Sequence, residues 1–409
     1  MKIVHTADWH LGDHLHRLDR TEDLRSRVVE VARICDERGA DVLIIAGDVF
    51  SNHSMVSAVD MTGELEHILK VFGPFFRRGG TILAVTGNHD MDKHIEFIRA
   101  GMRLAAVTSP SAKPLSPGRM YFQNGPGVAT LEAAGERIQF VFVPYPFAHR
   151  YADDADDLKS SEDRNRRIAD RVGTWVQKAT DKPEFDKTLP SVLIAHLHVR
   201  GSATHSLYKI SESDDVTFGA DFIPSSWAYV ALGHIHKPQI LGGLEHVRYP
   251  GPLDRLDFGE RDDDRGVIVV DIGKRFGPEC RTPPEWVPIT PTPMHLISIT
   301  DTAEIEGLAD AYPDHATAIV KITVALRPGG PSRDEVTQRL RKLFPRLADL
   351  AFERSESVDG SDARPGIRGD ADYRETVRSY LIGKLTGHPE AIELSTLAET
   401  FLAQMETRS

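Results

Sequence analysis

The chain has 409 residues, of which 40% are hydrophobic and 27% are charged. These values are ordinary for a globular protein, and no apolar run approaches the ~20 residues that a membrane-spanning helix needs. The formal net charge of −12 has the wrong sign for a protein that holds nucleic acid by bulk charge alone. The first residues, MKIVHTADWH, lack the pattern of a secretory signal, and the chain has two cysteines, so we expect a cytoplasmic protein without a membrane span or disulfide framework.

The first part of the chain alternates short apolar runs with helical patterns, which is typical of a buried sheet covered by helices. The early predicted strands are IVHTAD, DVLIIAGD and TILAVTGN, with helices in RSRVVEVARICDERG and near residues 57–72. The later predicted strands are RIQFVFVPY, SVLIAH, WAYVALGH and GVIVVDI. We therefore expect an α/β domain over residues 1–288, with one mixed sheet or two packed sheets and with Cys35 in the core.

A proline-rich connector, TPPEWVPITPTPMH at residues 282–295, predicts a domain boundary because proline donates no ladder hydrogen bond and stiffens the chain. The strand and helix patterns that follow predict a small α+β domain over residues 289–354. Residues 355–372 have too few apolar side chains to fold and predict a flexible linker. Residues 373–409 predict two amphipathic helices, which either pack back on the domain or bind a partner.

Five short segments place metal-ligating side chains directly after apolar strands. They are Asp8-Trp9-His10, Gly47-Asp48, Gly87-Asn88-His89-Asp90, His196 and Gly233-His234-Ile235-His236. Ligands collect at the carboxyl ends of strands in open α/β sheets, so these five ends can converge on one crevice. The D-x-H and H-x-H spacings fit, because side chains two apart in an extended segment point the same way. Glycine before Asp48, Asn88 and His234 would let the backbone turn sharply after each strand.

Imidazole, carboxylate and amide ligands without thiolate favour Mn²⁺, Fe²⁺ or Zn²⁺ over Ca²⁺ or an iron-sulfur cluster. The set is too large for one ion and suits two ions that share a bridging carboxylate, as in two-metal phosphoesterases; it comprises Asp8, His10, Asp48, Asn88, His196, His234 and His236. His89 is left over, and it could stabilise a transition state or protonate a leaving oxygen, with Asp90 as its orienting partner.

Each motif alone is a weak signal, since a single histidine is more often a satisfied polar residue than a ligand, and only the ordered combination carries the interpretation. The remaining histidines are interpreted as surface groups or as neighbours of the ligands, namely His14, His16, His53, His94, His198 and His205.

The order D-x-H, G-D, G-N-H-D, H and G-H-x-H resembles the signature of calcineurin-like metallophosphoesterases. More narrowly, the SbcD-type exonuclease subunits of SbcC/SbcD DNA repair complexes are similar in MKIVHTADWHLG, LIIAGDVF, VTGNHD, H-x4-G at residues 196–201, LGHIHKPQ and RYPGPLDRLDFGE. The resemblance implies a four-layer α/β/β/α sandwich with a small α+β capping domain and tethered C-terminal helices. It also implies that the helices after the linker bind the SbcC coiled-coil ATPase, and that the chain forms a homodimer within a heterotetramer.

The resemblance further assigns residue roles. Asp8, His10 and His236 would bind one metal; Asn88, His196 and His234 would bind the other; Asp48 would bridge the two; and His89 would be the catalytic histidine. Family members are manganese-dependent nucleases that degrade DNA from 3′ ends and open hairpins or single strands, and Mg²⁺, Fe²⁺ or Zn²⁺ could also occupy such a site.

The sequence departs from the family pattern at two places. Ser51 stands where some relatives have His or Asp, with His53 two positions on. Pro250-Gly251-Pro252 stands where many relatives read P-G-S-P. These departures leave open what Ser51 and His53 do and how the loop at Gly251 is shaped.

Two clusters of arginines are candidate DNA phosphate contacts, although mixed charges on a helix usually form a solvated, salt-bridged face. They are Arg17, Arg20, Arg25 and Arg27 after the first motif, and Arg164, Arg166, Arg167 and Arg171 in EDRNRRIADR.

Two other functions remain alternatives to a nuclease. One is hydrolysis of a small phosphoester at the same metals, against which the predicted tethered helices argue. The other is a scaffold that bridges DNA ends with a vestigial site, against which the full ligand set argues.

Overall fold

The computed structural model describes residues 1–51, 58–105, 115–151, 160–204, 215–219, 222–223, 226–273, 283–327 and 329–354. Its largest part contains two six-stranded mixed sheets. The first sheet has the order β16-β15-β1-β4-β5-β6, in which β1, β4, β5 and β6 are parallel and β15 and β16 are antiparallel to their neighbours. Its strands are β1 (Lys2–Thr6), β4 (Val42–Ala46), β5 (Thr81–Val85), β6 (Met120–Gln123), β15 (Arg265–Asp271) and β16 (Glu285–Ile289).

The second sheet has the order β13-β14-β12-β9-β8-β7, in which β8, β9, β12 and β14 are parallel. Its strands are β7 (Gly127–Ala133), β8 (Glu136–Val143), β9 (Ser191–His196), β12 (Tyr229–Gly233), β13 (Gln239–Ile240) and β14 (Val247–Tyr249). The chain therefore forms the second of the two expected arrangements, two packed sheets.

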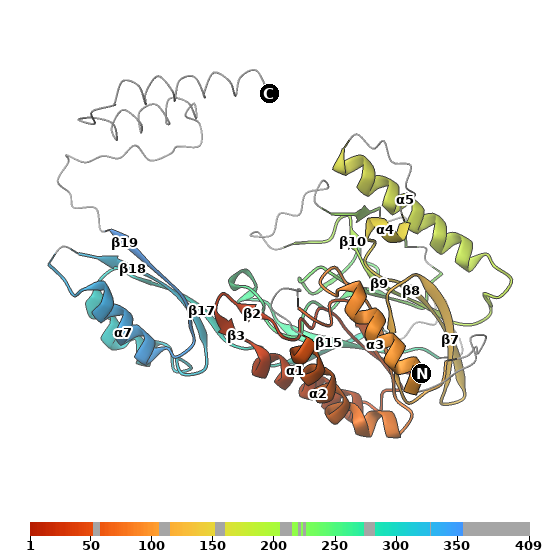
Figure 1. The fold of residues 1–409 in the computed structure, drawn as a ribbon, viewed down its shortest axis with the longest axis horizontal. Coiled ribbons are helices and arrows are strands. Elements are labelled where there is room, and N and C mark those ends of the chain that lie inside the picture. Colours follow the sequence, from red (N-terminus) through yellow and green to blue (C-terminus); the bar gives the residue numbers. More distant parts are fainter. Residues whose placement is uncertain are drawn as a thin grey trace, which may run out of the picture. The chain divides into compact units, whose positions relative to one another are not determined.

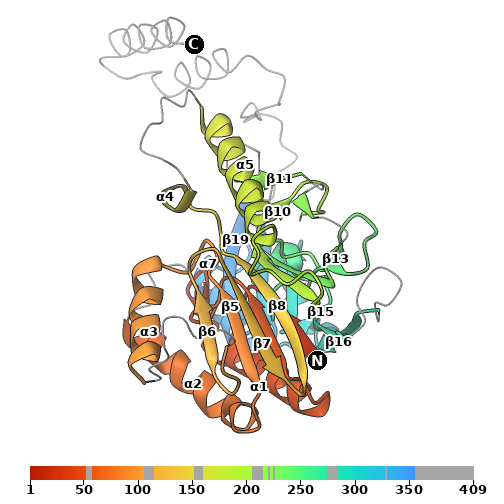
Figure 2. The ribbon, with the colours of Figure 1, turned by 90° about the vertical axis from the view of Figure 1, so that its right-hand side faces the viewer.

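Helices cover the outer faces of both sheets (Figures 1 and 2). On the first sheet lie α1 (Thr21–Glu37), α2 (Ala58–Arg77) and α3 (Asp92–Ala105); on the second lies α5 (Ser161–Thr180), which follows the short α4 (Ala148–Tyr151). The alternation along β4 explains the layers, because Leu43 and Ile45 pack against the helices whereas Val42 and Ile44 pack between the sheets. The expected four-layer α/β/β/α sandwich is thus confirmed, and Cys35 lies in the core on the buried face of α1.

A three-stranded sheet with its own hydrophobic core follows. It contains β17 (Met294–Ile299), β18 (Ile319–Leu326) and β19 (Leu347–Arg354), with the helix α7 (Arg333–Leu343). The helix expected in TAEIEGLADAY is a 3-10 turn, η3 (Thr302–Gly307), which Asp301 and Glu304 cap at its start, and then the short α6 (Leu308–Ala311). Strand β19 is an addition to the expected elements.

The proline-rich connector differs from its prediction, because part of it is strand β16. Pro288 lies opposite Gly266 in β16, which is an edge strand of the first sheet. The missing N–H group of this proline therefore removes no hydrogen bond between interior strands. The domain boundary near residue 288 stays a prediction. The expected linker at 355–372 and helices at 373–409 lie outside the described residues.

Three small elements complete the described part. They are the hairpin β2 (His14–Leu15) and β3 (Leu18–Asp19), the parallel pair β10 (His198–Val199) and β11 (Thr217–Phe218), and the 3-10 turn η2 (Phe258–Glu260). Among the described helices, none is both long and apolar enough to cross a membrane.

Candidate metal centre

The predicted ligands follow the carboxyl ends of β1, β4, β5, β9 and β12, and backbone hydrogen bonds hold the loops that carry them together. The N–H group of Asp8 donates to the Gly47 carbonyl, and that of His10 donates to the Asp48 carbonyl, each at 3.0 Å. In the second sheet, Gly233 lies in register with His196. The two sheets therefore bring their carboxyl-end loops to a common site.

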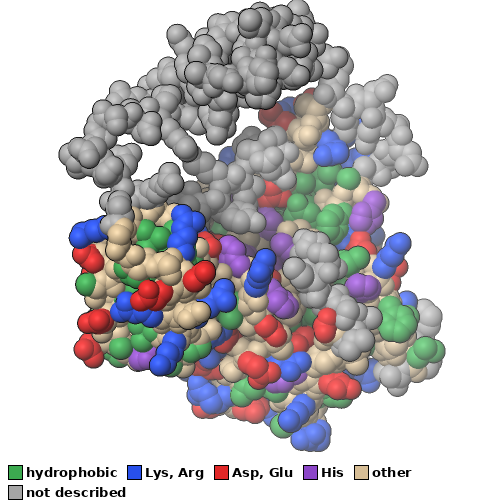
Figure 3. All heavy atoms as spheres, turned by 60° about the vertical axis from the view of Figure 1, so that its left-hand side comes forward, with side chains coloured by type: hydrophobic (Ala, Val, Ile, Leu, Met, Phe, Trp, Pro, Cys, Tyr) green, Lys and Arg blue, Asp and Glu red, His purple; other side chains and the backbone are tan. Residues whose placement is uncertain are grey.

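Three overlapping groups of side chains can each hold a metal ion, with ligand atoms within 4.8 Å of one another; they are Asp8 with His10 and His236, His10 with Asp48 and His89, and Asp8 with Asp48 and His196. Asn88 joins this cluster, because its Oδ1 lies 3.1 Å from His196 Nε2 and 3.0 Å from His234 Nδ1. All seven predicted ligands and His89 thus lie together. Figure 3 shows histidine side chains gathered at a hollow of one face of the molecule.

Backbone strain is concentrated in this cluster. Among the described residues, six that are not glycine have positive φ, and four of them are predicted ligands: Asp8 (52°), His10 (47°), Asp48 (49°) and His234 (93°). Such conformations cost about 1–3 kcal/mol each and persist only where the surrounding structure enforces them. The strain therefore marks the cluster as a functional site.

The three glycines that precede ligands have different roles. Only Gly47 has positive φ, at +94°, and a Cβ there would lie 1.9 Å from His196 Nδ1. A Cβ on Gly87 would lie 2.0 Å from Asp48 Oδ1, and one on Gly233 would lie 1.9 Å from the Ala46 carbonyl oxygen. The expected sharp turn thus applies to Gly47, whereas Gly87 and Gly233 are small because neighbouring groups approach them closely.

Hydrogen bonds orient the imidazole rings. His196 Nδ1 lies 2.8 Å from the Ala46 carbonyl oxygen, His234 Nε2 lies 2.6 Å from Asp215 Oδ2, and His236 Nδ1 lies 2.7 Å from Glu260 Oε1. When each of these nitrogens donates, the other ring nitrogen keeps its lone pair. This is the usual arrangement of histidines that bind metals.

Asp215 and Glu260 were missed in the sequence. Glu260 belongs to the RYPGPLDRLDFGE segment, so that resemblance could have drawn attention to it. Asp215 follows residues without a recognisable motif, and only tertiary structure brings it 2.6 Å from His234.

The pKa shifts within the cluster differ in direction. In spite of burial, the charge of Asp48 and its hydrogen bond raise the pKa of His196 to about 9, whereas the pKa of His10 is lowered. His10 Nε2 is buried and has no hydrogen-bond partner among the described residues, and burial lowers the pKa of this imidazole to about 3, so its lone pair is available. Burial raises the pKa of the Asp8 carboxyl, although His196 and His236 oppose the shift. Burial would raise the pKa of Asp48 too, but the charge of His196 and its hydrogen bond lower it overall. These buried, oxygen- and nitrogen-rich ligands fit divalent cations.

His89 and Asp90 occupy different environments. The His89 ring lies edge-on to His10, with ring centroids 4.9 Å apart, and its backbone N–H donates to Asp48 Oδ1 at 2.7 Å. The carboxylate of Asp90 instead accepts the backbone N–H groups of Gly87 at 2.9 Å, Phe50 at 3.0 Å and Val49 at 3.3 Å. Asp90 therefore joins the loops after β4 and β5, and these bonds give no support to its expected role as an orienting partner of His89.

The arginine predictions need one correction. Arg20 is fully buried; its Nε lies 2.7 Å from Asp23 Oδ2 and its Nη2 lies 3.2 Å from Asp254 Oδ2. A guanidinium with these partners and no exposure cannot reach a DNA phosphate, so the prediction for Arg20 is wrong. Arg17 is exposed in the turn between β2 and β3 and stays a candidate.

The other candidate arginines follow the salt-bridged alternative where their partners are described. Arg25 pairs with Glu64 at 2.8 Å, and Arg166 pairs with Glu162 at 3.2 Å. Among the departures from the family pattern, Ser51 is buried and donates to Asp13 Oδ1 at 2.6 Å, whereas His53 lies outside the described residues.

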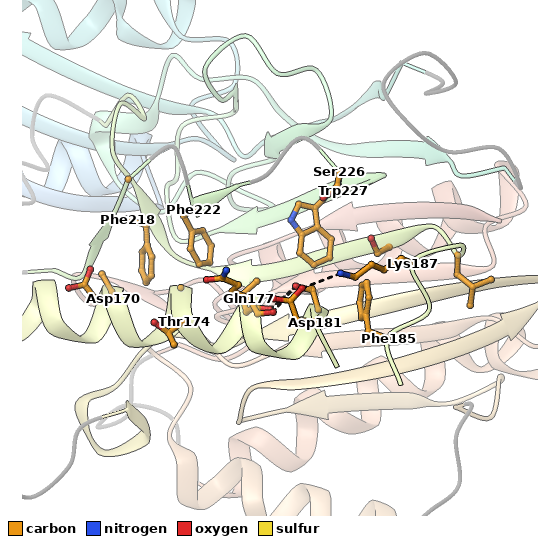
Figure 4. Close-up of a pocket in the computed structure, with 17 residues that line it drawn as sticks. Asp170, Thr174, Gln177, Asp181, Phe185, Lys187, Phe218, Phe222, Ser226 and Trp227 are labelled. Carbon is orange, nitrogen blue, oxygen red and sulfur yellow. Dashed lines mark hydrogen bonds and ion pairs between the residues drawn. The ribbon is translucent and has the colours of Figure 1, made fainter. Parts of the chain in front are cut away.

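A cavity of about 930 Å³ lies elsewhere, between α5 and the segment from β11 to β12 (Figure 4). Phe218, Phe222 and Trp227 face it from one side, and Asp181 pairs with Lys187 at 3.1 Å along its edge. None of the residues that line it is a predicted ligand, so the cavity is separate from the metal centre.

Comparison with known proteins identifies the family. The family described as calcineurin-like phosphoesterase matches residues 1–238, which is more than half of the chain, and the chain belongs to it. Within this family the chain is similar to the SbcD subunit of the nuclease SbcCD from Rhodobacter capsulatus, with 26% identity over 93% of both chains. It is also similar to the SbcD subunit from Escherichia coli K12, with 27% identity over 76% of this chain and 74% of the other, and to that from Bacillus subtilis, with 25% identity over 66% of each.

Proposed function

We propose that this protein is the metal-dependent nuclease subunit of an SbcC/SbcD-type complex, which hydrolyses DNA phosphodiesters from 3′ ends and at hairpins or single strands. The observation that carries the proposal is the convergence of all seven predicted ligands on one site. The similarity to the SbcD subunit of the nuclease SbcCD over 93% of the chain supports DNA as the substrate. A cytoplasmic location stays a prediction.

The proposed ligands divide into two sets around a shared carboxylate. Asp8, His10 and His236 would hold one ion, and Asn88, His196 and His234 the other, with Asp48 common to both. The close approach of Asp8, His10 and His236 supports the first set, and the contacts of Asn88 with His196 and His234 support the second, although His196 also lies close to Asp8 and Asp48. Two divalent ions, for which we propose Mn²⁺, would supply positive charge to the phosphodiester and a nucleophile at neutral pH.

His89 is proposed to contact the substrate. Its half-buried ring beside His10 and Asp48 is in reach of a phosphoryl oxygen or leaving group at the ions, where it would donate a proton or hydrogen bond. Asp90 would fix the loop that carries His89 through the backbone bonds it accepts.

The first experiment measures cleavage of a 3′-labelled duplex and of a DNA hairpin by the purified chain with Mn²⁺, Mg²⁺ or EDTA. We expect Mn²⁺-dependent cleavage, and we expect Asp48→Asn to reduce it at least about 100-fold, since a lost ion removes several kcal/mol of transition-state stabilisation. Asp170→Asn is the matched control, because this carboxylate is exposed on α5 and lies outside the cluster.

Each result distinguishes the proposal from its alternatives. Turnover of p-nitrophenyl phosphoesters without DNA cleavage would assign the site to a small phosphoester. Cleavage that survives Asp48→Asn would contradict the metal centre. If the isolated chain is inactive on both substrates, the assay is repeated with an SbcC-like ATPase, and inactivity there as well would refute the nuclease.

The proposal also names the binding partners of the chain. The helices expected at residues 373–409 would bind the coiled-coil ATPase, and Arg17 would contact DNA. A homodimer is supported by exposed apolar side chains on α2 and α3, two helices that lie on the same face of the first sheet (Figures 1 and 2). Phe97 is 82% exposed, Leu104 81% and Leu69 65%; Phe97 and Leu104 are seven residues apart and so lie on one face of α3, and contiguous exposed apolar surface marks interaction sites.

A further inference from the structure

The two proposed metal positions differ in the charge of their own ligands. The position of Asp8, His10 and His236 has one carboxylate besides the shared Asp48. The position of Asn88, His196 and His234 has only neutral ligands besides Asp48. A divalent cation would therefore be held less strongly at the second position unless another negative charge lies nearby.

The carboxylate behind His236 is neutralised. Glu260 Oε1 lies 2.7 Å from His236 Nδ1, while Glu260 Oε2 lies 2.6 Å from Nη2 of Arg265. Arg265 is 1% exposed and also donates to the His236 carbonyl oxygen at 3.0 Å. Because the cation and the carboxylate are both buried, this pair adds almost no net charge to the first position.

The carboxylate behind His234 keeps its charge. Asp215 is 4% exposed; its Oδ2 lies 2.6 Å from His234 Nε2, and its Oδ1 accepts from the Tyr145 hydroxyl at 2.9 Å and from the Val216 N–H at 2.8 Å. His198 Nδ1 lies 3.5 Å from Oδ2. Within the described ranges, no lysine or arginine forms an ion pair with Asp215.

We propose that Asp215 is a positioning residue that supplies the negative charge which the Asn88, His196 and His234 ligands lack, and thereby retains the metal ion at that position. It acts through His234 by fixing the ring so that Nδ1 faces Asn88, and by its charge. Together with Asp8 at the other position, it gives each ion one carboxylate besides Asp48. The inference rests on the proposed two-metal site.

Manganese binding to the metal-free protein tests the proposal without an activity assay. Calorimetry and electron paramagnetic resonance of the full chain should detect two Mn²⁺ ions. In Asp215→Asn we expect the affinity for one of them to fall about 10- to 100-fold, as is typical when a group behind a ligand is removed, and the other affinity to change less than about threefold. Tyr145→Phe is the matched control, since it removes a hydrogen bond to Asp215 but no charge.

A second pair of variants keeps Asp215 in place and changes its surroundings. His198→Lys would put a cation beside Asp215, as Arg265 lies beside Glu260, whereas His198→Gln would not. We expect one Mn²⁺ ion to bind at least about fivefold more weakly to the lysine variant than to the glutamine variant, by analogy with other groups behind ligands. This comparison decides the question if Asp215→Asn fails to fold.

The outcomes separate this inference from the proposed function. If the wild type binds fewer than two Mn²⁺ ions, the two-metal site itself is wrong. If the wild type binds two and the Asp215→Asn or His198→Lys variants bind both as tightly, or lose both equally, the assignment of Asp215 is wrong while the nuclease proposal stands. A metal-free Asp215→Asn protein that melts much earlier and retains both affinities when folded would show a purely structural role.

Discussion

At the scale of single residues, the metal centre depends on conformations that its sequence does not favour locally. Asp8, His10 and Asp48 have positive φ, although none is glycine, and the loops after β1 and β4 are tied by backbone hydrogen bonds. Gly47 is placed where a Cβ would collide with the His196 ring. The site is therefore preorganised by the surrounding fold, and this cost is offset elsewhere in the molecule.

Gly47 and Gly79 have nearly equal φ, so alanine substitutions at these two positions distinguish the cost of backbone strain from the cost of a steric clash. Gly47 has φ +94° and Gly79 has φ +92°, but a Cβ on Gly79 would meet nothing within 4 Å. Gly79→Ala should lower the free energy of unfolding by about 1–2 kcal/mol from strain alone. Gly47→Ala should lower it by about 2 kcal/mol more, because His196 must move, and should weaken Mn²⁺ binding. Denaturant unfolding and metal titration check this, and equal losses in both variants would contradict it.

Arg20 and Arg17 are three positions apart, but we expect Arg20 to stabilise the fold and Arg17 to contact DNA. Arg20→Ala should lower the free energy of unfolding by about 3–5 kcal/mol, because it leaves the buried Asp254 without its cation. Arg17→Ala should change stability by less than about 0.5 kcal/mol and should weaken DNA binding. Chemical denaturation and fluorescence anisotropy with labelled DNA distinguish the two. A DNA-binding loss in folded Arg20→Ala that exceeds that of Arg17→Ala would restore Arg20 as a contact.

At the scale of elements, most strands were recognised because they are short, continuously apolar and buried on both faces, as β4 and β9 are. Elements at the edge of a sheet were harder to predict from the sequence. Strand β16 contains Pro288 and is largely exposed, and neither its composition nor its pattern predicts pairing. The helix expected after β17 is divided into the 3-10 turn η3 and the short α6, and Gly307, a poor helix former, lies at their junction.

The apolar face of α3 carries a prediction about assembly. Phe97→Glu combined with Leu104→Glu should convert a dimer to a monomer, because charged side chains cannot be buried there without partners. The melting temperature of the monomer fold should fall little, since both side chains are exposed within the subunit. Light scattering after size-exclusion chromatography measures the mass. Val29→Glu on α1, where Val29 is 48% exposed, is the control and should remain dimeric.

At the scale of the whole molecule, acidic side chains outnumber basic ones, and Lys and Arg alternate with Asp and Glu over the face in Figure 3. The described arginines are largely engaged with carboxylates, as Arg25 and Arg166 illustrate. If the chain acts as proposed, its DNA affinity would therefore come from local contacts, from the metal ions and from the proposed ATPase partner.

The salt dependence of DNA binding tests how much of the affinity comes from contacts with DNA phosphates. The isolated chain should bind a DNA duplex weakly, and the slope of log K against log salt should be shallow, because each phosphate contact contributes about 0.9 to it. Anisotropy titrations over a range of salt concentrations, with metal present and with EDTA, give the slope. A slope that corresponds to about eight or more released counterions would contradict the prediction.

The sequence by itself determined the α/β class, the order of most strands and the set of candidate ligand residues, which remain a prediction. It could do so because hydrophobic periodicity and the D-x-H, G-N-H-D and G-H-x-H motifs are local properties of the chain. Only the tertiary structure decided that Asp215 and Glu260 support His234 and His236, that Arg20 is buried, and that Gly87 and Gly233 are small for reasons of space. Those facts depend on contacts between residues that are not neighbours in the chain, such as Arg20 and Arg255, which are 235 positions apart, and no local pattern records such contacts.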